Sequence, residues 1–209
     1  MNLYLSSYKF GNDPEKLREL IPQNNKLGYI NNSRDFVGRS PEIADNYQKE
    51  EINFLNDLGF LSEPIDLKDY FGNKKALDEK LMSLGSIWIS GGNTFVLRQA
   101  MKLSGFDKLF QKLKTRKDFL YGGYSAGICI LSNSLKPIDQ VDEPQNFPYK
   151  EIKAPIYEGL GLLDYIIIPH YKSNHHESEM MDKEVARCIK EKWAYKTLSD
   201  GEVIIMKSS

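Results

Sequence analysis

Little in this sequence points to nucleic-acid binding, membrane insertion or a disulfide scaffold. Its 209 residues carry 28 basic and 29 acidic side chains, a formal net charge of −1, whereas nucleic-acid binders usually show a basic excess. No apolar run approaches the ~20 residues that span a bilayer, and the first residues lack the features of a secretory signal. The chain has only two cysteines, Cys129 and Cys188, too few for a disulfide framework. These absences predict a cytoplasmic protein that binds neither nucleic acid nor membranes.

The length and composition are those of one ordinary globular domain. A chain of 209 residues fits a single domain, and hydrophobic residues at 41% with charged residues at 27% are typical of soluble proteins. No internal repeat, low-complexity tract or linker divides the sequence. We therefore expect one domain over residues 1–209, and the sequence leaves open whether it forms a homodimer.

Short apolar runs alternate along the chain with longer segments of helical periodicity. This alternation predicts an α/β fold with a mainly parallel sheet. The proline-rich segment Asn133–Leu160 predicts a long excursion from the sheet that could include a hairpin, and loops of that length are usually functional. Strands are expected at Leu3–Ser7, Lys26–Asn31, Ser86–Ser90, Phe119–Tyr121, Tyr165–Pro169 and Val203–Met206, and helices at Pro41–Leu58, Asp78–Leu84, Thr94–Leu103, Phe106–Lys117 and Met180–Lys192.

A G-x-S-x-G sequence at Gly123–Gly127 stands between a predicted strand and an apolar helical segment. A sharp strand-to-helix turn needs small neighbours and holds the serine side chain out at the end of the sheet. The following helix adds N–H groups and a positive partial charge that would stabilise an oxyanion. Ser125 is therefore a candidate nucleophile, although a glycine-rich turn that only packs tightly has the same signature.

Two further segments follow predicted strands. In Ser90–Thr94 the glycines would let the backbone approach a ligand, and Asn93 or Thr94 could cap the next helix. The segment matches neither a P-loop nor a dinucleotide-binding fingerprint. His170 ends the most apolar strand, at the sheet edge where α/β proteins bind ligands, and could accept the Ser125 proton.

Taken together, these segments resemble the peptidase E family of serine peptidases, which includes aspartyl dipeptidases and cyanophycinase-like enzymes. The resemblance is carried by Ser90–Phe95, Gly123–Gly127 and Pro169–Tyr171, which occur in the family's order. It implies a flavodoxin-like three-layer α/β sandwich with a mainly parallel sheet, like the class I glutamine amidotransferase domain. It also implies a serine peptidase that cleaves small peptides and needs no metal or organic cofactor.

The resemblance assigns roles to individual residues. It implies that Ser125 is the nucleophile, that His170 is its base and that the N–H groups of Gly92 and Ala126 form the oxyanion hole, with Asn93 beside them in the substrate site. A carboxylate should orient His170. The first candidate is Asp142, which matches an acidic residue in the family's Asp-x-Pro loop, and the alternative is Asp200, with Glu177 and Glu179 remaining open.

The sequence departs from the dipeptidase pattern after the histidine. There the family has an arginine that reads the substrate aspartate, whereas here no arginine follows before Arg187, and lysine is a poor substitute for a guanidinium fork. The resemblance therefore does not carry aspartate specificity over to this chain. We expect loops such as Asn133–Leu160 and Lys172–Met181 to set the substrate preference.

Several other interpretations remain open from the sequence. The main one is a non-catalytic or differently specific small-molecule-binding domain of amidotransferase-like fold. A cysteine enzyme would need Cys129, which follows Ser125 by one helical turn, to act in place of that serine. An α/β-hydrolase proper usually has a longer chain. A metal site would have to use His170, His175, His176 and Glu179, but adjacent histidines lack the i, i+4 spacing of a zinc helix.

Overall fold

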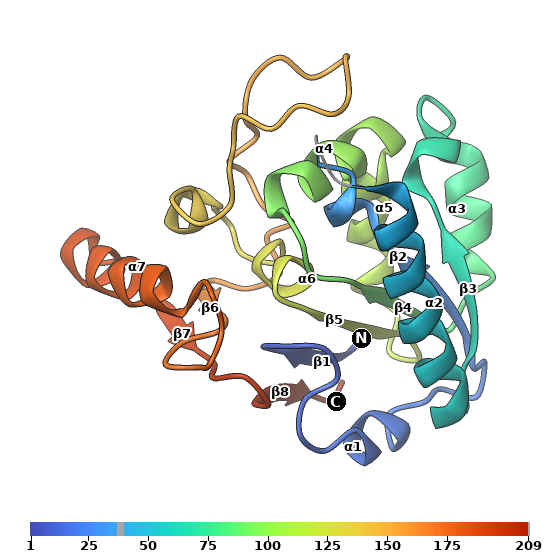
Figure 1. The fold of residues 1–209 in the computed structure, drawn as a ribbon. Helices are drawn as coiled ribbons and strands as arrows, with labels where there is room; N and C mark the ends of the chain where they lie inside the picture. Colours follow the sequence, from blue (N-terminus) through green and yellow to red (C-terminus); the bar gives the residue numbers. More distant parts are fainter. Residues whose placement is uncertain (37–39, 209) are drawn as a thin grey trace.

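The computed structural model describes residues 1–36 and 40–208 and places a central sheet between helices on both faces (Figure 1). The six strands are ordered β3-β2-β4-β5-β1-β8, and all neighbours are parallel except β8, which is antiparallel to β1. Their bounds are β1 Asn2–Ser6, β2 Lys26–Ile30, β3 Leu61–Ile65, β4 Ser86–Ile89, β5 Leu120–Tyr124 and β8 Val203–Met206. This topology confirms the predicted flavodoxin-like α/β fold with a mainly parallel sheet.

Two hydrophobic cores lie on opposite faces of this sheet. Successive side chains of a strand point to opposite faces, so Leu3 and Leu5 enter one core while Tyr4 enters the other. Helices α1 (Glu15–Arg18) and α2 (Pro41–Leu58) contribute to the Tyr4 core. The core of Leu3 and Leu5 is covered by α3 (Lys74–Met82), α4 (Thr94–Ser104), α5 (Phe106–Leu113) and α6 (Ala126–Cys129). Burial on both faces explains why these strands read as nearly continuous apolar runs.

The predicted strand at Tyr165–Pro169 forms, but it lies outside the central sheet. It appears as β6 (Ile166–Ile168) and pairs in parallel with β7 (Tyr195–Thr197) in a separate two-stranded sheet. Helix α7 (Ser178–Glu191) packs on this pair through a small core that includes Met181 and Cys188. Figure 1 shows this orange and red unit at the left of the view, at the side of the central sheet.

Three elements were not predicted from the sequence: α1, β3 and β7. Strand β3 lies at the edge of the sheet and includes Pro64, and both its polar content and its proline are features that edge strands tolerate. Helix α1 has four residues and β7 has three, too few to show a period. Three short 3₁₀ helices complete the structure: η1 (Asn32–Arg34), η2 (Leu67–Tyr70) and η3 (Lys136–Ile138).

The excursion Asn133–Leu160 contains η3 and a single antiparallel bridge, between Ser134 and Glu158, and forms no longer hairpin ladder (Figure 1). Helix α4 holds it in place, because Arg98 donates to the Glu158 carbonyl at 2.6 Å and Gln99 to the Asn146 carbonyl at 2.7 Å. Among the described residues, no helix is long and apolar enough to cross a membrane.

Candidate active site

A strained turn at Ser125 joins β5 to α6. Ser125 has φ 48° and ψ −115°, a backbone conformation that residues other than glycine rarely adopt. The turn lies close against β4: a Cβ atom at Gly123 would stand 2.7 Å from the Ile89 carbonyl oxygen, and one at Gly127 would clash with the same oxygen. The small neighbours that the G-x-S-x-G pattern supplies are therefore required by the packing of the turn on β4.

His170 follows β6 and forms a short contact with a carboxylate. Its Nδ1 atom lies 2.7 Å from Oδ1 of Asp200, and the imidazole is 2% exposed. Because a carboxylate can only accept, Nδ1 carries the proton in this contact and Nε2 is left as an acceptor. Burial lowers the pKa of His170, while the contact with Asp200 raises it in part. The imidazole ring is therefore neutral at pH 7 and able to take up a proton.

Ser7, directly after β1, connects the histidine and the carboxylate. Its hydroxyl accepts from the His170 backbone N–H at 2.8 Å and lies 2.9 Å from Asp200 Oδ1, to which it can donate. Ser7 is fully buried, and the Asp200 N–H donates to Ser173 Oγ at 2.7 Å. The sequence analysis missed Ser7 as a site residue, since a serine at the end of a strand has no distinctive local pattern.

Asp142, the first candidate for the acid, lies elsewhere. Its Oδ2 atom accepts from the Thr94 N–H at 2.8 Å, at the start of α4, where Asn93 also caps the helix by accepting from Val96. Burial raises the pKa of Asp142 to about 7. The structure therefore brings Asp200, the alternative candidate, to His170, and gives Asp142 a position at the amino end of a helix.

The two glutamates that the sequence left open occupy other positions. Glu177 Oε2 lies 3.9 Å from Nε2 of His170, which is the nitrogen that must face a nucleophile and not the one that a triad acid holds. Glu179 forms an exposed ion pair with Lys183 at 3.4 Å. Neither residue can orient the His170 ring through Nδ1.

The loop after β4 lies directly against the serine turn. A Cβ atom at Gly91 would lie 3.1 Å from the Ser125 Cβ, and Gly92 has φ +147° with no room for a side chain beside the Ser33 carbonyl oxygen. The Asn93 N–H donates to that same carbonyl at 2.8 Å. Ala126 is the first residue of α6, where N–H groups have no intrahelical acceptor. The loop after β4, through Gly91, and the first residue of α6, Ala126, thus flank Ser125 from two elements.

A cleft of about 610 Å³ brings these segments together, a volume suited to a small ligand. Ser125 and His170 both line it, and the carboxyl groups of Asp142 and Glu177 lie along it as well. A further wall consists of Tyr8, Lys9, Arg34 and Tyr47, none of which the sequence analysis singled out.

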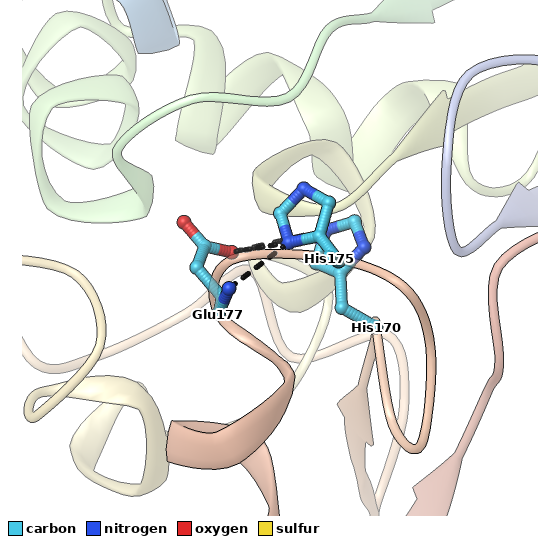
Figure 2. A group of neighbouring side chains, drawn as sticks. All are labelled: His170, His175 and Glu177. Carbon is cyan, nitrogen blue, oxygen red and sulfur yellow. Dashed lines mark hydrogen bonds and ion pairs between the residues drawn. The ribbon is translucent and has the colours of Figure 1, made fainter.

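Figure 2 shows His170, His175 and Glu177, whose potential metal-ligating atoms all lie within 4.8 Å of one another. The two imidazoles stack face to face at 3.7 Å and 7°, so their in-plane lone pairs run parallel and do not converge on one ion. The Glu177 N–H donates to His175 Nδ1 at 3.3 Å, and burial and His170 lower the pKa of His175 to about 4. This group fits a polar wall of the cleft better than a tetrahedral metal site. His176 and Glu179, the other sequence candidates, lie outside it.

Comparison with known proteins identifies the family and agrees with the fold. The sequence model of peptidase family S51 matches residues 36–208. An uncharacterized peptidase of Listeria monocytogenes is 31% identical over 172 residues, which cover 76% of this chain and 77% of that protein. A Drosophila melanogaster protein named a probable alpha-aspartyl dipeptidase is 27% identical over 158 residues, 74% of this chain and 60% of that one. The crystal structure of a candidate peptidase E protein from L. monocytogenes EGD-e superposes with a TM-score of 0.74 at 25% identity and covers 100% of this chain and 98% of that one.

Proposed function

This chain belongs to peptidase family S51, and we propose that it hydrolyses small peptides with Ser125 as nucleophile and His170 as general base. Family membership and the likeness to peptidase E support a peptidase, as the resemblance predicted. The observation that carries the serine mechanism is the 2.7 Å contact between His170 Nδ1 and Asp200 Oδ1, beside a cleft that Ser125 also lines. Asp200 is our assignment for the third member of the triad.

The reaction would proceed through an acyl-enzyme. His170 Nε2 takes the Ser125 hydroxyl proton while Oγ bonds to the scissile carbonyl carbon. The same nitrogen then gives that proton to the leaving amine as the carbon–nitrogen bond breaks. In the second half, Nε2 takes a proton from water, the water oxygen bonds to the acyl carbon, and Ser125 leaves with the proton restored. Asp200 stabilises the imidazolium that forms in each half.

We assign the oxyanion hole to the backbone N–H groups of Gly92 and Ala126. Gly92 follows Gly91, the residue of the loop after β4 that lies against Ser125, and Ala126 is the first residue of α6, directly after Ser125. N–H donors fixed in the backbone need no reorganisation when charge develops on the carbonyl oxygen, and removing one donor typically costs about 10²–10³ in kcat. The strained backbone of Ser125 supports this arrangement, since such strain usually persists where function requires it.

The alternatives from the sequence are less well supported. A non-catalytic binding domain would be favoured by a histidine without a carboxylate or by a blocked serine, whereas Asp200 contacts His170 and Ser125 lines the cleft. Cys129 is 4% exposed, burial raises the pKa of its thiol, and Sγ lies 3.5 Å from the Ile167 carbonyl oxygen. A buried thiol of raised pKa is a poor nucleophile, so Cys129 is a packing residue.

The experiment is an assay of purified protein on a panel of dipeptides and tripeptides, compared with a Ser125→Ala variant. We expect hydrolysis by the wild type and a loss of at least about 10³-fold in the variant, with Cys129→Ala as the matched control that keeps its activity. A fluorophosphonate probe should label the wild type and not the Ser125→Ala variant. Hydrolysis that survives in Ser125→Ala, or that is lost in Cys129→Ala with its fold intact, would contradict the assignment.

A further inference from the structure

One wall of the catalytic cleft carries two cations that have no ion-pair partner in the described part of the chain. Lys9 and Arg34 both line the cleft that holds Ser125. Within residues 1–36 and 40–208, neither forms a salt bridge, whereas the other arginines all do at 2.6–3.2 Å. Those paired arginines are Arg18, Arg98, Arg116 and Arg187. A cation kept in a cleft without a protein partner is a candidate ligand-binding group.

Arg34 is held rigidly and close to the nucleophile. Its Nη2 atom donates to the Tyr124 hydroxyl at 2.8 Å, and its guanidinium carbon lies 4.7 Å from the centre of the Tyr47 ring. Tyr124 directly precedes Ser125, so the guanidinium is fixed with respect to the serine through a single residue. Such preorganisation reduces the entropy lost when a ligand binds.

The buried carboxylate of Glu51 acts electrostatically on both Arg34 and Lys9, but among the described residues it forms no ion pair with either. Glu51 is 3% exposed, and its two carboxylate oxygens accept from the hydroxyl groups of Tyr124 at 2.6 Å and Tyr29 at 2.8 Å. The Nε atom of Arg34 is buried and has no partner among the described residues. Burial alone would lower the pKa of Arg34, but Tyr124 and Glu51 raise it overall, so the guanidinium is charged. It therefore keeps donors that the protein does not satisfy.

Lys9 adds a second positive charge to this wall. Its Nζ atom lies 6.0 Å from the centre of the Tyr47 ring, the ring that Arg34 also covers, and 5.7 Å from that of Tyr8. The acids that line the cleft are Asp142, Glu143 and Glu177; they come from other segments, and Asp142 and Glu177 interact with each other. An anionic ligand group would be repelled beside those carboxyl groups and attracted to the Lys9–Arg34 wall.

We propose that Arg34, with Lys9 beside it, binds a carboxylate of the peptide substrate and so makes the enzyme selective for anionic short peptides. The inference rests on the proposed peptidase function. A guanidinium presents a planar fork that matches the two oxygens of a carboxylate, and in a partly desolvated cleft that pairing is stronger than on an open surface. The carboxylate is either the free carboxyl terminus of the peptide or an aspartate or glutamate side chain.

Binding to the Ser125→Ala protein tests this site without requiring turnover. Calorimetry would compare the free acid of Ala-Leu with its amide, and the amides of Ala-Asp and Asp-Leu with those of Ala-Asn and Asn-Leu. We expect either the free acid of Ala-Leu or the aspartyl amides to bind about 10- to 100-fold more tightly than the matching neutral peptide. Preference for the free acid identifies the carboxyl terminus, and preference for the aspartyl amides identifies a side chain.

Arg34→Gln in the same background should abolish this preference, and Arg34→Lys should keep part of it. Lys172→Gln is the matched control, because Lys172 is exposed and lies outside the lining of the cleft, so its removal should leave the preference intact. Thermal unfolding verifies that each variant is folded, and Lys9→Gln gives a second test should Arg34→Gln unfold. Equal affinity for anionic and neutral peptides in Ser125→Ala, or a preference that survives both Arg34→Gln and Lys9→Gln, would overturn the proposal.

Kinetics of the active enzyme separate this proposal from the proposed function. With Ser125 present, Arg34→Gln should raise KM for anionic peptides relative to neutral ones by the same 10- to 100-fold factor. If the wild type binds anionic peptides selectively but hydrolyses none of the peptides, the peptidase assignment fails and the carboxylate site stands. If hydrolysis is normal and Arg34→Gln leaves the ratio of KM values for anionic and neutral peptides unchanged, the peptidase assignment stands and the carboxylate site fails.

Discussion

Replacing Asp200 with asparagine should disable the base while leaving the cleft intact. In the native protein, Oδ1 of Asp200 lies 2.7 Å from Nδ1 of His170 and holds the proton on that nitrogen. An asparagine can turn its amide group to donate to Nδ1, which moves the ring proton to Nε2. A protonated Nε2 cannot take the proton of Ser125, so the first chemical step is blocked.

The expected loss in kcat follows from this move of the His170 ring proton from Nδ1 to Nε2. In Ser-His-Asp peptidases the same substitution lowers kcat by about 10⁴, or about 5 kcal/mol in the activation free energy. The Asp200 side chain is 23% exposed, so water can compensate in part, and we expect a loss of about 10²–10⁴ in kcat. KM should change little, since Asp200 is not among the residues that line the cleft.

The assay is steady-state kinetics on the best dipeptide substrate, with Asp142→Asn as the comparison. Asp142 contacts Thr94 and not His170, so we expect its variant to lose less than about 10-fold in kcat. The Asp200 carboxylate raises the pKa of His170, so its removal should lower that pKa. In a plot of residual kcat against pH, the fall on the acidic side should therefore move to lower pH. An Asp200→Asn enzyme within threefold of wild type, or an Asp142→Asn enzyme with the larger loss, would refute the assignment.

Three further expectations concern the same framework. Ser7→Ala removes the hydroxyl that bonds both the His170 N–H and Asp200, so kcat should fall about 10-fold. The buried His170 N–H loses its acceptor, so the melting temperature should fall by several degrees, as kinetics and calorimetry would show. Burial raises the pKa of Asp142 from 3.8 to about 7 in the folded protein, so wild-type stability should fall as the pH rises from 4 to 7. Asp142→Asn should remove up to about 4 kcal/mol of that fall, measured by urea unfolding at pH 4 and pH 8. Gly127→Ala should lower both the melting temperature and activity, because its Cβ would clash with the Ile89 carbonyl oxygen, whereas an alanine at the exposed Glu179 should change neither.

The parts of the site that sequence predicted are those that local patterns encode. The glycines around Ser125 predict a tight turn, and in the structure they lie against the Ile89 carbonyl, where a side chain would not fit. His170 lies at the end of an apolar strand, where the periodicity placed it. Each of these features depends on a few consecutive residues, so one sequence without its relatives was enough to find them.

The parts that sequence could not predict depend on contacts between distant segments. Ser7 lies 193 residues from Asp200, and no local pattern marks either residue as a partner of His170. Similarity to an acidic loop favoured Asp142, but burial at the start of α4 leaves it bonded to Thr94. Strand β6 was recognised as a strand, yet its partner is β7, whose three residues show no period of their own. Arg34 lies on a 3₁₀ helix of three residues, which carries no motif.

The site residues come from two different sheets, so contacts between the sheets must hold Ser125 and His170 in position. Ser125 belongs to the central sheet through β5, whereas His170 follows β6 of the small sheet. The His170 N–H and the Asp200 carboxylate both bond to the Ser7 hydroxyl, so the base and its acid are attached to β1 of the central sheet together. Cys129 on α6 packs against the Ile167 carbonyl of β6 at 3.5 Å, where α6 meets the small sheet beside the serine. A larger side chain at position 129 would therefore displace the base from the nucleophile without breaking its contact with Asp200.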